Sequence, residues 1–131
     1  MRKRNLSSYI LAALLPFAAI NAVNAQEIIG RYTAFIGADD LFNSRGARLT
    51  EPWQVIRQDR ANFHRFNIFQ DGDQWDPFFG NANNRAAMED MLRRGSISPT
   101  AARDILSGGR VIDVTIFGRG NRGDYIEVTV F

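Results

Sequence analysis

Two segments near the carboxyl end alternate between apolar and polar residues, and this pattern restricts the fold more than any other feature of the chain. The segments cover residues 110–117 and 125–131. Because successive side chains of a β-strand point to opposite faces, each segment places three apolar residues on one face. These residues are Ile112, Val114, Ile116, Ile126, Val128 and Val130. The glycine-rich stretch between the segments predicts a β-hairpin with one buried face.

A further strand is predicted at residues 27–36, where the apolar residues also alternate. One face carries Ile28, Tyr32, Ala34 and Ile36, and the other carries Ile29, Arg31, Thr33 and Phe35. Residues 63–69 carry apolar side chains at a spacing that fits either a helix or a strand, and we favour a strand.

Three helices are expected between these strands, at residues 50–60, 85–94 and 98–106. Pro52 and Pro99 each stand in a predicted first turn, where the missing N–H of proline costs no helical hydrogen bond. Thr50 is the expected cap of the first helix, and a left-handed Gly95 should end the second. The sequence therefore predicts an α+β fold, in which an antiparallel sheet of the N-terminal strand and the C-terminal β-hairpin packs against two or three short helices.

The first 25 residues have the pattern of a secretory signal peptide. A basic start is followed by an apolar run from Tyr9 to Ile20 that is too short to span a bilayer comfortably. Small residues at Val23 and Ala25 predict cleavage before Gln26. We therefore expect a signal peptide at 1–25 and a single exported globular domain at 26–131, periplasmic or secreted and not stably inserted in a membrane after cleavage.

Removal of this segment changes the charge of the chain. Three of the 16 basic residues lie in it, so thirteen arginines face fourteen acidic residues in the expected mature domain. A formal charge of −1 offers no general attraction to nucleic acid, and we expect no such partner. The chain has no cysteine, so its stability must come from core packing without a disulfide.

The only histidine, His64, lies in the densest group of potentially catalytic residues. As a general base it would use Asp59 or an acid of the loop at residues 71–76 as the orienting group, with Arg60 or Arg65 stabilising a developing negative charge. The alternative is a half-buried, hydrogen-bonded or solvated histidine with no catalytic role, and we favour this alternative.

Residues 71–76 place three carboxylates close together, at Asp71, Asp73 and Asp76. They are the candidate metal ligands, because calcium prefers several oxygen ligands on a flexible loop. Their spacing is not that of an EF-hand. We favour a series of turns with Trp75 and two phenylalanines anchored to the core, and we expect no cofactor.

Residues 118–123 match the pattern G-x-G-x-x-G, but a strand rather than a helix follows, which argues against a nucleotide site. Arg119 and Arg122 of this turn remain candidates for contact with an anion. With Trp75 they form the candidate ligand-binding set.

The sequence thus favours a non-catalytic exported module that binds an unidentified protein, an anion or a small molecule. The alternative is a small hydrolase based on His64.

Overall fold

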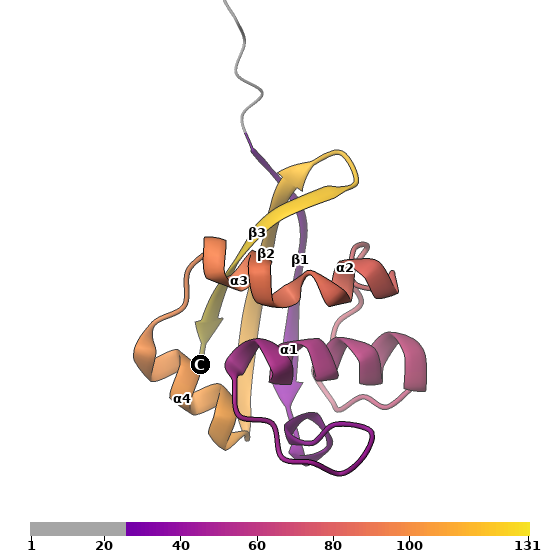
Figure 1. Ribbon diagram of the computed structural model, residues 1–131, viewed down its shortest axis with the longest axis vertical. Coiled ribbons are helices and arrows are strands. Elements are labelled where there is room, and N and C mark those ends of the chain that lie inside the picture. The colour runs from indigo at the N-terminus through magenta and orange to yellow at the C-terminus, as the bar shows by residue number, and fades with distance from the viewer. Residues whose placement is uncertain (1–25) are drawn as a thin grey trace, which may run out of the picture.

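Three long strands form one sheet in the order β1-β2-β3, each antiparallel to its neighbour (Figure 1). The strands are β1 (Glu27–Ile36), β2 (Arg110–Arg119) and β3 (Arg122–Val130). This computed structural model describes residues 26–131, so the expected signal peptide lies outside the described residues. The antiparallel sheet with its C-terminal β-hairpin confirms the predicted architecture.

The register of the sheet follows the apolar alternation. Val114 of β2 pairs with Tyr32 of β1 on one side and with Val128 of β3 on the other, and all three side chains are buried. A bulge between Ile28 and Gly30 shifts the register at the start of β1. Ile28 was expected to share a face with Tyr32, Ala34 and Ile36, which are buried, but it is 63% exposed because it precedes this shift.

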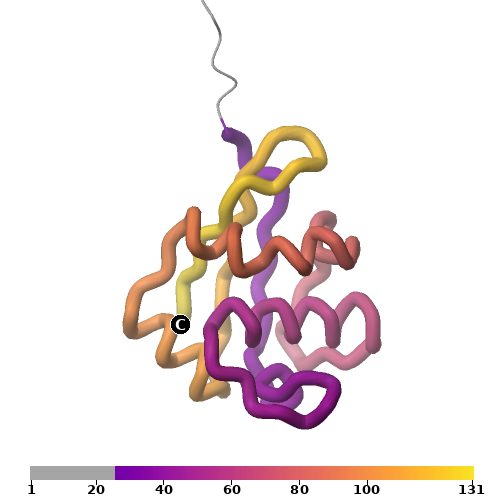
Figure 2. Tube along the Cα trace, viewed as in Figure 1, coloured from indigo at the N-terminus to yellow at the C-terminus, as the bar shows by residue number. Residues whose placement is uncertain are grey.

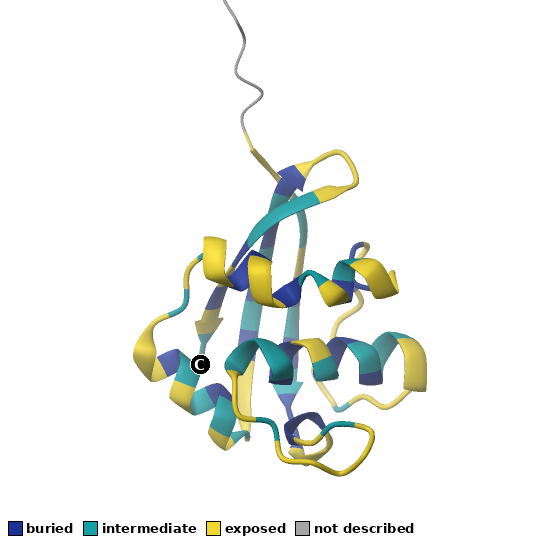
Figure 3. Cartoon of the chain, in the orientation of Figure 1, coloured by how far each residue is buried: buried dark blue, intermediate teal, exposed yellow. Residues whose placement is uncertain are grey.

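The helical segments lie over one face of the sheet (Figures 1 and 2). They are η1 (Ala38–Leu41), α1 (Pro52–Ala61), the π-helical turn η2 (Asn62–Phe66), α2 (Ala82–Ala86), α3 (Met88–Arg94) and α4 (Pro99–Ser107). Their buried side chains meet those of the sheet in one apolar core (Figure 3). The largest fully buried apolar side chains include Ile36, Ile56, Phe79, Met88 and Ile105. Among residues 26–131, no helix has the length and apolar character needed to cross a membrane.

The N-cap of helix α1 lies one residue later than predicted. Glu51, rather than Thr50, is the N-cap residue, and the side-chain oxygen of Gln54 accepts hydrogen bonds from the N–H groups of both. The helix also buries Asp59, which is 1% exposed.

The strand predicted at residues 63–69 is wrong. The chain instead continues from α1 into η2, and Asn67 ends this turn in the left-handed conformation with φ of 56°. The N–H of Ile68 then donates to the carbonyl of Asn62 at 2.8 Å. The apolar spacing of residues 63–69 fits either a helix or a strand. The segment begins as a helical turn because α1 directly before it is already helical and is easily extended.

The predicted helix at 85–94 is two helices, α2 and α3, separated at Ala87. Gly95 is not left-handed as expected, since its φ is −99°. Its role is steric: a Cβ here would overlap the carbonyl oxygen of Ile126 in β3. Helix α4 begins as predicted, and the hydroxyl of Ser98 accepts a hydrogen bond from the N–H of Ala101 at 3.0 Å.

Loops cover the middle of both sheet edges. On the β1 edge, the N–H groups of Thr33 and Phe35 donate to the side chains of Gln74 and Asp73 at 3.0 and 2.7 Å. On the β3 edge, Ser96 exchanges backbone hydrogen bonds with Ile126 and Val128.

Candidate functional site

Two of the predicted catalytic residues lie in a buried ionic cluster. Arg60, near the end of α1, is completely buried. Its Nε donates to Asp59 Oδ2 at 2.7 Å, and its Nη1 donates to Asp76 Oδ1 at 3.1 Å and to the carbonyl of Gln74 at 2.9 Å. The guanidinium also lies over the Tyr32 ring, 4.0 Å from its centre. Arg60 thus joins α1, β1 and residues 71–76, which we call the acidic loop, inside the core, where no substrate reaches it.

The structure places His64 beside Asp76 rather than Asp59. Its Nε2 lies 2.7 Å from Asp76 Oδ1, and the imidazole is 8% exposed. The other oxygen of Asp76 accepts hydrogen bonds from the N–H groups of Phe78 and Phe79 at 2.9 and 2.6 Å. One carboxylate therefore fixes the histidine, the buried arginine and the start of the next loop.

The environment separates the pKa values of these carboxyl groups. Burial raises the pKa of Asp59 to about 7, although the charge of Arg60 acts in the opposite direction. Burial alone would also raise the pKa of Asp76, but hydrogen bonds from His64 and the Phe79 N–H, together with Arg60, lower it overall. Burial raises the pKa of the Tyr32 hydroxyl well above its ordinary value, so the ring beside Arg60 is neutral.

The three candidate metal ligands are not gathered around one point. Asp73 accepts hydrogen bonds from the N–H groups of Phe35 and Gln70, and Asp76 belongs to the ionic cluster. Asp71 is exposed. In the part of the chain that the structure describes, no group of three or more acidic, histidine or cysteine side chains is arranged to hold a metal ion.

The candidate ligand-binding residues occupy two different segments. Arg119 and Arg122 lie at the hairpin tip, where their Nε atoms are 3.8 and 3.9 Å from the carboxylate oxygens of Asp124. Their positive charge is thus partly compensated. Trp75 is 67% exposed on the acidic loop, so it does not anchor that loop to the core as expected.

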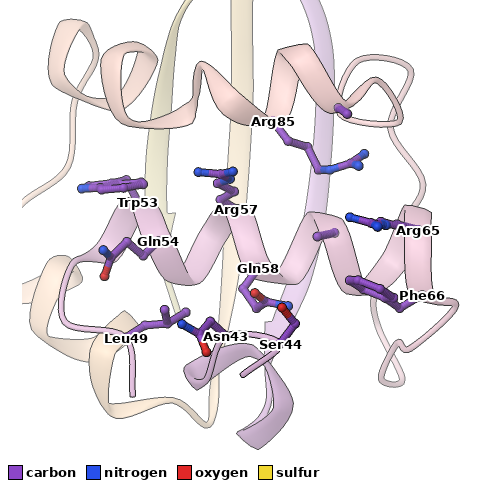
Figure 4. A pocket seen from close by; sticks show the side chains of 12 residues that line it. Asn43, Ser44, Leu49, Trp53, Gln54, Arg57, Gln58, Arg65, Phe66 and Arg85 are labelled. Carbon is purple, nitrogen blue, oxygen red and sulfur yellow. The ribbon is translucent and has the colours of Figure 1, made fainter. Parts of the chain in front are cut away.

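A more strongly cationic site, which was not predicted from the sequence, is a groove of about 370 Å³ (Figure 4). We call it the arginine groove. Arg57 of α1, Arg65 of η2 and Arg85 of α2 extend into it, and Trp53 lines its other end. None of its twelve lining residues is acidic. Within residues 26–131, none of these three arginines forms an ion pair with a carboxylate.

Arg85 shows the effect of this uncompensated charge. Its side chain is largely buried, and its Nη1 donates to the carbonyl oxygens of Phe79 and Gly80 at 2.8 and 3.1 Å. Burial lowers the pKa of Arg85, and the positive charges of Arg65 and Arg57 lower it further, whereas the charge of Asp76 acts in the opposite direction. The two carbonyls hold the guanidinium in place without neutralising it.

The arginine groove had one signal in the sequence. Arg57, Ala61 and Arg65 are spaced by four residues, which places them on one stripe of a continuous helix. A strand at residues 63–69 would not place Arg65 on the same helix face as Arg57, so the stripe was not predicted. The contribution of Arg85 depends on tertiary packing and has no local pattern.

No family model, no curated protein and no solved structure matches this chain.

Proposed function

We propose that this protein is an exported, non-catalytic binding module that holds an anionic ligand in the arginine groove. The observation that carries the proposal is the convergence of Arg57, Arg65 and Arg85 on one groove whose lining contains no acidic residue. The domain as a whole has a small negative formal charge, so this positive charge is a local feature rather than a general property of the surface.

Arginine suits this role because its planar guanidinium donates two parallel hydrogen bonds to a carboxylate or a phosphate. Arg85 is already fixed by two backbone carbonyls, so little side-chain entropy is lost when a ligand binds it. A bound anion also relieves the repulsion that Arg57 and Arg65 exert on Arg85. These effects favour an anion over a neutral ligand.

The lining of the groove favours binding over catalysis. Ser44 is its only hydroxyl side chain, and the lining contains no histidine or carboxylate that could act as a general base. The remaining polar lining residues are amides, which position a ligand without transferring protons from it.

The fluorescence of Trp53, which lines the groove, can report ligand binding directly. A Trp75→Phe background leaves Trp53 as the only tryptophan, and its fluorescence is followed during titration with pyrophosphate or citrate. Arg57→Gln should weaken binding about tenfold or more, because it removes a charge-assisted contact. Arg103→Gln is the matched control, since Arg103 is an exposed helical arginine on α4 outside the groove. Failure of both anions to bind, or equal losses in the two variants, would contradict the proposal.

One observation favours a second candidate, the hydrolase based on His64. The 2.7 Å contact between His64 Nε2 and Asp76 Oδ1 is the geometry of a histidine oriented by an acid, and Asp76 of the loop takes this role in place of Asp59. Purified protein that cleaves a phosphodiester, glycan or peptide substrate, and loses this activity in His64→Ala, would support the hydrolase. Cleavage that persists in His64→Ala would exclude it.

A further inference from the structure

A second hollow of about 270 Å³ adjoins the arginine groove, and we call it the apolar hollow. It shares part of its lining with the groove, including Asn43, Gln58 and Phe66. Phe42, Phe66 and Ile68 supply its apolar surface, and they are 42%, 41% and 42% exposed. Three large apolar side chains left exposed around one hollow are typical of a binding surface.

Turn η2 connects the two sites. Its consecutive residues Arg65 and Phe66 both line the groove, and Phe66 lines the hollow as well. A ligand that reaches Arg65 thus lies beside an exposed aromatic ring. Asp39 lines the hollow, so a negative charge is repelled there and the anionic part of the ligand must lie at the arginine end.

The shared wall, which includes Asn43, Ser44 and Gln58, offers both hydrogen-bond donors and hydrogen-bond acceptors. The oxygen of the Asn43 side chain accepts from the N–H groups of Arg45 and Ala47 at 3.0 and 2.9 Å, which leaves its NH₂ group to donate. The NH₂ group of Gln58 donates to Asn62 at 2.9 Å, which leaves its oxygen to accept. A peptide group presents the complementary pair, a C=O and an N–H. An acyl chain would leave both side-chain groups unpaired, which is unfavourable away from water.

We propose that the ligand is a short peptide that carries carboxylates next to a bulky apolar side chain. Its carboxylates bind Arg57, Arg65 and Arg85, its backbone meets Asn43 and Gln58, and its apolar side chain enters the apolar hollow. This assignment rests on the proposed anion-binding function and adds to it the chemical class of the ligand.

The test compares two peptides of equal charge, acetyl-Phe-Glu-Glu and acetyl-Ala-Glu-Glu, by isothermal titration calorimetry against residues 26–131. The phenylalanine peptide should bind about tenfold more tightly, because its ring is removed from water in the hollow. Ile68→Ser should reduce this ratio towards one without weakening the alanine peptide. Val111→Ser, which changes an equally exposed apolar residue on β2 outside the hollow, should leave the ratio unchanged.

The outcomes separate this inference from the function on which it rests. Equal affinities for the two peptides, with both weakened by Arg57→Gln, would overturn the peptide assignment and keep the anion site. Tighter binding of dodecanoate than of the phenylalanine peptide would also overturn it, in favour of an acyl ligand. If neither the peptides nor pyrophosphate binds, the anion-binding function itself fails.

Discussion

At the scale of single residues, Arg60 and Asp76 carry the largest electrostatic consequences. Buried charges lose their hydration and are tolerated only when paired and hydrogen-bonded. Arg60 meets this condition through two carboxylates and a carbonyl, and Asp76 through four donors or charged groups. The residue types Asp59, Arg60 and His64 drew attention in the sequence because they resemble catalytic groups. Arg60 and His64 are held by contacts with the loop residues Gln74 and Asp76, which lie 12 to 16 positions away in the sequence.

Asp59 gives the folded protein a defined dependence on pH. Its pKa is about 7 in the folded state, against about 4 for an aspartate in an unfolded chain, so only the folded state binds this proton between those values. The resulting stability is fully present below about pH 4 and is lost as the pH rises through 7. The free energy of unfolding, measured in urea from pH 4.5 to 7.5, should therefore fall across this range. Asp59→Asn should remove most of this fall, and an undiminished slope in the variant would contradict the assignment.

At the scale of elements, the helices and strands that were predicted correctly are those whose residue pattern fits only one type of secondary structure. Strands β1, β2 and β3 lie where alternation placed them, because a one-residue slip would turn the whole apolar set to the other face. Turn η2 could not be predicted in the same way, since its spacing of Phe63, Phe66 and Ile68 fits two structures. The arginine groove was missed for this reason, and because Arg85 reaches it only through the packing of α2 beside α1.

Gly95 shows how closely α3 approaches the sheet. A Cβ at this position would overlap the Ile126 carbonyl, which also accepts the N–H of Ser96. Gly95→Ala should therefore cost about 3 kcal/mol or more, because backbone on both sides has to shift. Gly46→Ala is the control: Gly46 has a φ of 79° and open space around it, so the cost should be about 1 kcal/mol from backbone strain alone. If urea unfolding gave the same loss of unfolding free energy for both variants, the close approach of Gly95 to β3 would make no contribution to stability.

At the scale of the whole molecule, the charges are distributed unevenly. Several exposed arginines lie near carboxylates, as in the contacts of Arg31 with Asp113 and of Arg93 with Glu89. The three arginines of the groove differ: they line one pocket together, and within residues 26–131 none of them forms an ion pair with a carboxylate. The total charge of the expected mature domain follows from its composition. The positions at which arginines lack a carboxylate partner are known only from the fold.

Export is the remaining prediction at this scale. If residues 1–25 are a cleaved signal peptide, intact-mass analysis of protein recovered from the cell envelope or medium should give a chain that starts at Gln26. The physical reason is the pair of small residues, Val23 and Ala25, after the apolar run. A recovered mass that still includes residues 1–25 would favour an uncleaved anchor.

The covered sheet edges affect the tendency of this protein to aggregate at high concentration. An unpaired edge strand is a template on which a second chain can add, and such addition leads to polymers. Here Gln74 and Asp73 occupy the middle of the β1 edge, and Ser96 occupies the middle of the β3 edge. A chain that joined either edge would first have to displace these loops and break their hydrogen bonds. The protein is therefore protected against fibril growth by strand addition, even though no disulfide holds its loops in place.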